Sequence, residues 1–155
     1  MCINTTLENE WDYTTGTGSL FYDWSKAKTI TDEHGNERID VPEREKHLNE
    51  HDFTVLCKHF KGTVFEDIYN QLTQKYHVGR VRLMRSKPKT CLSWHRDTSR
   101  RIHFPIKTQE GCFMVIENEI LHLKKDQWYL TDTMPNHTAF NASKENRIHL
   151  VAVVL

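Results

Sequence analysis

The chain has 155 residues, the size of one domain, and 37% of them are hydrophobic. Its 21 lysines and arginines balance its 21 aspartates and glutamates, so the formal net charge at pH 7 is zero. This balance argues against a strongly basic nucleic-acid-binding protein. No apolar run approaches the ~20 residues of a membrane span. We therefore expect neither nucleic acid nor a membrane as a partner.

Cysteine usage indicates a reducing compartment. The four cysteines lack the C-x-x-C spacing of zinc ribbons and thioredoxin-like redox pairs. They are expected to be reduced and mostly buried thiols, which is typical of cytosolic proteins. The polar residues 1–10 contain no signal-peptide core. We therefore expect a cytoplasmic protein, with its oligomeric state left open.

The first 60 residues give weak local signals. Gly35-Asn36 predicts a hairpin turn between short strands near 26–31 and 37–41. Further on, the apolar residues recur at helical spacing and predict a helix over 52–60. The residues on which this helix rests are Phe53, Leu56, Cys57 and Phe60. Lys61-Gly62 would end it.

A second helix has a clear start. Thr63-x-x-Glu66 is a capping box, in which the two side chains cap each other's backbone N–H groups. One apolar stripe follows, made of Val64, Phe65, Ile68, Leu72 and Tyr76. Residues 77–79 stop the pattern. Such a stripe is typical of a helix packed against a sheet.

From Gly79 onward the period of the apolar residues changes from 3.6 to 2. The predicted strands are 80–85, 91–95, 101–107, 112–117, 120–124, 127–131, 138–141 and 147–154. Many short strands with brief connections indicate an antiparallel sandwich or barrel. We predict a mainly β (α+β) fold, a double-stranded β-helix of the jelly-roll or cupin kind, with the N-terminal helices packed on one outer face. The whole chain, 1–155, would be one domain, with strands and helices in 1–78 and the β-helix core in 79–155.

Candidate metal ligands lie in this second half. In His95-x-Asp97 the two side chains point to the same face of a strand and can converge on one cation. The alternative is an exposed histidine beside an aspartate that opens a turn. His137 follows a turn and is expected at the barrel rim, although a histidine there can also be an ordinary surface residue. Two imidazoles and one carboxylate with open positions describe the facial triad of non-haem Fe(II) oxygenases.

Two strands each carry an arginine and a histidine on one face. Arg101 shares a face with His103, and Arg147 shares a face with His149, while the alternate positions are mostly branched and apolar. If the apolar faces pack under the helices, the basic faces point into the barrel. Buried arginines are costly without an anionic partner, and a bound dicarboxylate is such a partner. The alternative is that the arginines are exposed.

These residues together resemble a known family, the aspartyl/asparaginyl β-hydroxylases. The resemblance covers about residues 80–155 and rests on combined motifs, each of which is unspecific alone. They are the run from Trp94 to Ile106, which includes H-x-D and R-x-H-x-P, then Glu110-Gly111-Cys112, His137, and Arg147 ten residues later. Family members are Fe(II)- and 2-oxoglutarate-dependent oxygenases with a double-stranded β-helix fold.

The resemblance implies a role for each matching residue. His95, Asp97 and His137 would bind iron, and Arg147 would hold the distal carboxylate of 2-oxoglutarate. Arg101 and His103 would lie near the 1-carboxylate end of that co-substrate. The vertebrate members have a glycine at the position of Asp97, so this chain is more similar to members that keep the full triad. Their substrates in epidermal-growth-factor-like domains are therefore not carried over.

The implied reaction uses Fe(II), 2-oxoglutarate as co-substrate and O2. It would hydroxylate an amino acid, free or in a peptide or protein, and release succinate and CO2. Substrate choice is expected to depend on the aromatic N-terminal segment and the loop at 86–91. The alternative function is a non-enzymatic cupin-like module that binds a metal or an anion. A cupin-type enzyme using Zn, Mn or Ni is a further alternative, because this ligand set does not select a metal by affinity alone.

Overall fold

The computed structural model describes residues 1–6, 20–23 and 26–155. Trp11, Tyr13 and Trp24 of the aromatic N-terminal segment lie outside these residues. The strands are β1 (Asn4–Thr5), β2 (Lys28–Thr31), β3 (Glu37–Asp40), β4 (Val55–Leu56), β5 (Val78–Ser86), β6 (Thr90–Cys91), β7 (Arg100–Lys107), β8 (Cys112–Ile116), β9 (Glu119–Leu121), β10 (Tyr129–Thr131), β11 (His137–Asn141) and β12 (Arg147–Val154). The helical elements are α1 (Val64–Lys75) and two short 3-10 turns, η2 (Glu50–Asp52) and η3 (Lys58–Phe60).

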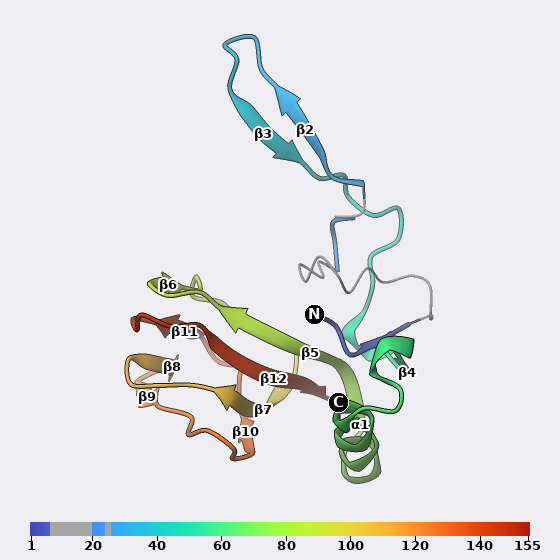
Figure 1. Cartoon of the computed structure of the whole chain (residues 1–155), viewed down its shortest axis with the longest axis vertical. Helices are drawn as coiled ribbons and strands as arrows, with labels where there is room; N and C mark the ends of the chain where they lie inside the picture. Colours follow the sequence, from blue (N-terminus) through green and yellow to red (C-terminus); the bar gives the residue numbers. More distant parts are fainter. Residues whose placement is uncertain (7–19, 24–25) are drawn as a thin grey trace.

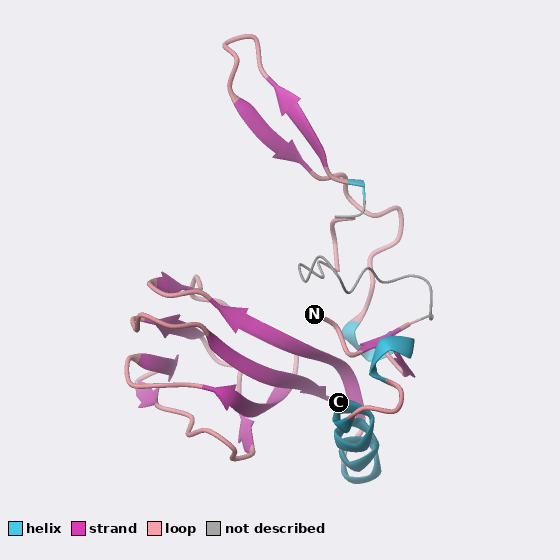
Figure 2. Ribbon diagram, viewed as in Figure 1, coloured by secondary structure: helices cyan, strands magenta, loops and turns pink. Residues whose placement is uncertain are grey.

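Strands β5 to β12 form two antiparallel four-stranded sheets that face each other (Figures 1 and 2). The strand orders are β10-β7-β12-β5 and β6-β11-β8-β9. Consecutive strands alternate between the sheets except for the hairpin β8–β9, and this interleaving is the order of a jelly roll. The predicted double-stranded β-helix is confirmed. The strand predicted at 91–95 is shorter than expected: β6 ends at Cys91, Leu92 still donates its N–H to the Ala139 carbonyl oxygen, and the next bridge to β11 is at His95.

The outer face of the β10-β7-β12-β5 sheet carries the main apolar core. Ile102 on β7 and Leu150 on β12 are buried there in one cluster with Leu72 of α1. Figure 1 shows α1 at the end of this sheet where β5 begins. The predicted packing of a helix on one outer face is therefore confirmed for α1. Among the described helices none is long and apolar enough to cross a membrane.

The start of α1 follows the capping signal with one variation. The Thr63 hydroxyl accepts a hydrogen bond from the Phe65 N–H at 3.2 Å. The Glu66 carboxylate reaches back to the N–H of Gly62, one residue before the cap, at 2.6 Å. The buried stripe is also rotated from the predicted one: Tyr69 is buried, whereas Val64 is 63% exposed.

The prediction of a helix over 52–60 is wrong. Instead of the two expected N-terminal helices, the described residues contain one α-helix, α1. The 52–60 segment is the strand β4 between the two 3-10 turns, and β4 pairs antiparallel with β1. Its four apolar residues are all buried, so their spacing does reflect a packed segment. Pairing with residues some fifty positions earlier is a non-local contact, which helical periodicity cannot reveal. The hairpin β2–β3 forms where it was predicted, with Gly35 at φ +83° in its turn, and it extends away from the sheets (Figure 1).

The inner face of the same sheet is basic. Arg101, His103, Arg147 and His149 are all buried, so the prediction that these side chains point inward is confirmed. The two histidines contact each other, with 3.4 Å between their Nδ1 atoms. Burial and then the nearby Arg147 lower the pKa of His103 to about 3 and that of His149 to about 2. Both rings are therefore neutral at neutral pH.

These lowered pKa values predict that stability falls in acid. The unfolded chain takes up protons near the ordinary histidine pKa of about 6.5, while the folded rings stay neutral to about pH 3. Their contribution is thus fully present above pH 6.5 and is lost as the pH falls. We expect each ring to add a slope of up to about 1.4 kcal/mol per pH unit. Urea denaturation of the metal-free protein between pH 7.5 and 4 measures it.

His149→Gln is the matched variant for this measurement. It removes one titrating ring, so about half of the histidine slope between pH 6.5 and 4 should disappear. His34→Ala, on the exposed hairpin turn, should leave the slope unchanged. A wild-type free energy of unfolding that stays flat between pH 6.5 and 4 would contradict the neutral buried pair.

Candidate metal centre

The predicted ligands His95, Asp97 and His137 come together at one end of the barrel. His95 and His137 form an isolated antiparallel bridge, with backbone hydrogen bonds of 3.0 and 2.9 Å in the two directions. The Asp97 N–H donates to the Thr133 carbonyl oxygen at 3.0 Å, which keeps the two segments side by side. One ligand atom from each of the three residues lies within 4.8 Å of the other two. The structure thus joins two segments that are forty positions apart in sequence.

The imidazoles of His95 and His137 are each oriented by a hydrogen bond to the backbone carbonyl two residues earlier. His95 Nδ1 lies 2.7 Å from the Ser93 carbonyl oxygen, and His137 Nδ1 lies 3.1 Å from that of Pro135. A carbonyl oxygen only accepts, so each Nδ1 must carry the proton. Each Nε2 then presents its lone pair, as a metal-binding histidine requires.

The two carboxylate oxygens of Asp97 contact different residues. Oδ2 lies 3.6 Å from His137 Nε2, on the side where a shared cation would bind. Oδ1 lies 3.1 Å from Nη2 of Arg101. His95 and Asp97 are half-buried and His137 is buried, so the group is reachable from one side. The donor set of two Nε2 atoms and one carboxylate oxygen fits a divalent transition metal with positions left open.

Arg147 is the unusual cation of the interior. It is only 8% exposed, and its Nε has no hydrogen-bond partner within residues 1–6, 20–23 and 26–155. Among the described residues no carboxylate lies within ion-pair distance of it. Burial lowers the pKa of Arg147, since the charged form loses its hydration there. A buried guanidinium without a carboxylate is costly unless a ligand supplies the anion.

The neighbouring histidines add hydrogen-bonding capacity beside Arg147. The Nε2 atoms of His103 and His149 are both buried, and neither has a hydrogen-bond partner among the residues that the structure describes. In the contact between their Nδ1 atoms, one must donate and the other accept. Because both rings are neutral, one Nε2 is then an N–H donor and the other an acceptor. The pair therefore offers one donor to an anion in the barrel.

Arg101 differs from Arg147 because its charge is already compensated. Its Nη2 contacts Glu50 Oε2 at 2.7 Å as well as Asp97 Oδ1, and its Nη1 donates to the Ser99 hydroxyl and carbonyl. Sequence reasoning missed Glu50. No motif marks this residue, and the only signal was that buried arginines need a carboxylate from somewhere in the chain.

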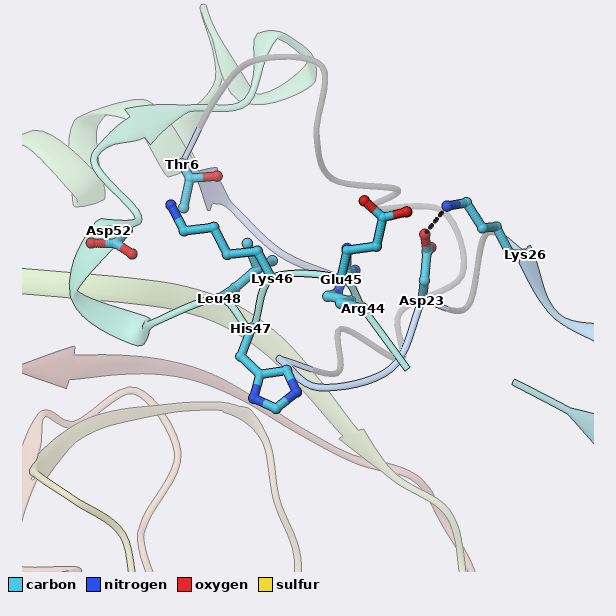
Figure 3. Close-up of a pocket in the computed structure, with 9 residues that line it drawn as sticks. All are labelled: Thr6, Asp23, Lys26, Arg44, Glu45, Lys46, His47, Leu48 and Asp52. Atoms are coloured by element: carbon cyan, nitrogen blue, oxygen red, sulfur yellow. Dashed lines mark ion pairs between the residues drawn. The ribbon is translucent and has the colours of Figure 1, made fainter. Parts of the chain in front are cut away.

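The structure contains cavities whose linings can be compared with the predicted site residues. One of about 520 Å³ is lined by none of the predicted site residues (Figure 3). Its lining is Thr6, Asp23, Lys26, Arg44, Glu45, Lys46, His47, Leu48 and Asp52. Another, of about 290 Å³, lies between the edge strands β9 and β10. Ile116 and Thr131 line it and pair in the sheets with His137 and Arg101, but none of the predicted site residues lines this second cavity.

Two solved structures are similar to this chain at low sequence identity. One is a cupin domain from Bordetella pertussis Tohama I, with 18% identity, a TM-score of 0.43, and coverage of 49% of this chain and 80% of that one. The other is a predicted oxalate decarboxylase from Thermotoga maritima, with 12% identity, a TM-score of 0.43, and coverage of 86% of this chain and 97% of that one. No curated protein matches the chain in sequence.

The sequence also matches a family model directly. The model is described as aspartyl/asparaginyl beta-hydroxylase, and it matches residues 22–155. This range contains all three members of the triad together with Arg101, His103, Arg147 and Glu50. The chain belongs to the aspartyl/asparaginyl beta-hydroxylase family.

Proposed function

We propose that the protein is an Fe(II)- and 2-oxoglutarate-dependent dioxygenase. It would hydroxylate an amino acid, free or within a peptide or protein, and release succinate and CO2. The observation that carries the proposal is the combination of a two-histidine, one-carboxylate cluster with a buried arginine, Arg147, that has no anionic partner in the described part of the chain. A module that only binds a metal has use for the first of these features but not for the second.

His95, Asp97 and His137 would hold the iron. When bound, the metal supplies the redox chemistry that couples 2-oxoglutarate decarboxylation to O2 activation. The chain contributes orientation, because the Ser93 and Pro135 carbonyls hold both rings with Nε2 toward the centre. Three protein ligands leave room for a bidentate co-substrate and O2.

Arg147 would bind the distal carboxylate of 2-oxoglutarate through a charge-assisted, bidentate contact. The single Nε2–H of the His103–His149 pair would donate to the co-substrate between Arg147 and the triad. The resemblance to the family also implies that Arg101 and His103 would lie near the 1-carboxylate end of the co-substrate. Since the Arg101 guanidinium already contacts Glu50 and Asp97, we propose that His103 carries the Nε2–H of the histidine pair and donates it to the 1-carboxylate.

Two further features support the proposed setting. All four cysteines are free thiols and three of them are buried, which supports the expected cytoplasmic location. Trp94 is 58% exposed next to His95, and Met134 is 43% exposed shortly before His137. Because both are exposed and close in sequence to the ligands, they are our candidates for contact with an amino-acid or peptide substrate.

Replacement of a ligand tests the proposed chemistry. His137→Ala removes one of three metal ligands, so iron-dependent succinate formation from 2-oxoglutarate should fall to background. His34→Ala, an exposed histidine on the hairpin, is the control and should keep wild-type turnover. Full turnover by a folded His137→Ala protein would exclude this residue as a ligand.

Arg147→Ala separates co-substrate binding from metal binding. Loss of a buried charge partner should weaken 2-oxoglutarate binding by about 2–5 kcal/mol. Fe(II) affinity should change little, since Arg147 is not a ligand. Calorimetric titration of both ligands measures the two effects. Arg85→Ala removes an exposed arginine from the adjacent strand β5 and should leave both affinities unchanged. Equal 2-oxoglutarate affinity in the two variants would refute the assignment.

A further inference from the structure

We infer that Glu50 is a positioning residue for the metal centre, acting through Arg101 on the ligand Asp97. The inference rests on the proposed metal site and adds a residue from the N-terminal half of the chain to it. Glu50 does not touch the candidate metal position. Its effect is to balance the charge of Arg101, so that Asp97 remains available to a cation.

Glu50 is a buried carboxylate with basic surroundings. Its side chain is 9% exposed. Oε1 accepts a short hydrogen bond from Arg80, and Oε2 accepts one of 2.7 Å from Arg101. Arg82 lies 3.8 Å from Oε1. One carboxylate thus meets three arginines of the barrel sheet.

The fold places this carboxylate tightly. Glu50 begins the 3-10 turn η2, which the Asn49 side chain caps by accepting from the His51 N–H at 3.0 Å. The Glu50 carbonyl oxygen lies directly over Gly79 of β5, where a Cβ atom would collide with it. The glycine therefore allows the N-terminal segment to approach β5 closely, and this approach delivers the Glu50 side chain to Arg80 and Arg101.

The geometry at Arg101 connects Glu50 with the triad. A single nitrogen, Nη2, lies 2.7 Å from Glu50 Oε2 and 3.1 Å from Asp97 Oδ1. This nitrogen has two N–H groups, so it can serve both carboxylates. Nη1 is held by Ser99. Arg101 therefore fixes Oδ1 of Asp97, while Oδ2 stays on the side of His137.

Charge decides how firmly Arg101 retains Asp97. Burial alone would raise the pKa of Glu50, but Arg80 and Arg101 more than offset this, so its pKa lies below the ordinary value and the group is ionised. Without that negative charge, Asp97 becomes the remaining carboxylate partner of Arg101. The guanidinium and a metal would then compete for Asp97, and the positive potential at the centre would rise. Metal affinity should fall.

The test uses Co(II) as the probe and the full, metal-free chain. Glu50→Gln keeps the size of the side chain but removes its charge. Its Co(II) dissociation constant should rise about 10- to 100-fold, the usual effect of altering an outer partner of a metal ligand. The visible Co(II) spectrum should change as well, because Asp97 is bound less firmly. Asp52→Asn is the matched control, an exposed carboxylate in the same 3-10 turn, and it should stay within about twofold of the wild type.

The outcomes separate this inference from the proposed function. If the wild type binds Co(II) and folded Glu50→Gln binds it equally well with the same spectrum, the role of Glu50 is overturned and the metal site stands. If the wild type binds no Co(II), the metal site itself is overturned, and this inference with it. Should Glu50→Gln fail to fold, Glu50→Asp retains the charge but cannot reach both Arg80 and Arg101. A several-fold weaker affinity supports the role in that case, and an unchanged affinity refutes it.

Discussion

Burial of positive charge between the two sheets is the constraint on which the rest of this structure depends. Arg80 and Arg101 point inward and are compensated by Glu50, with Asp97 as a second partner of Arg101. Arg147, at the other end of β12, has no such partner among the described residues. Because a buried charge is costly unless it is paired, we interpret the paired arginines, Arg80 and Arg101, as structural. We interpret Arg147 as a binding residue for an anionic ligand.

The two faces of the β10-β7-β12-β5 sheet differ in chemistry, one being apolar and the other basic. On β7 and β12, the apolar residues pack against α1 and the N-terminal strands, while the alternate basic residues face the other sheet. The N-terminal half is therefore more than a cover for the core. Through Gly79 it approaches β5 closely enough for Glu50 to enter the barrel. The stability of the N-terminal packing and the state of the metal centre are linked by this one side chain.

Much of the barrel could be predicted from the sequence, because alternation of side chains is a local property. The spacing of Arg101 with His103, and of Arg147 with His149, correctly predicts which side chains face inward. His95-x-Asp97 and His137 could be joined only through the resemblance to a family, since nothing local pairs two segments so far apart. Glu50 could not be found at all. Its partners are determined by the contact of η2 with β5, which lies about thirty residues later in the sequence. No pattern around Glu50 encodes that contact.

In the proposed function, a bound metal and the buried Arg147 together form a 2-oxoglutarate site. Anaerobic titration of the Fe(II)-loaded protein with 2-oxoglutarate tests it most directly. A bidentate co-substrate on iron gives a metal-to-ligand charge-transfer band in the visible spectrum, and we predict that this band appears and saturates at one equivalent. Stoichiometric Fe(II) binding with no such band on addition of 2-oxoglutarate would contradict the account and favour a module that only binds a metal.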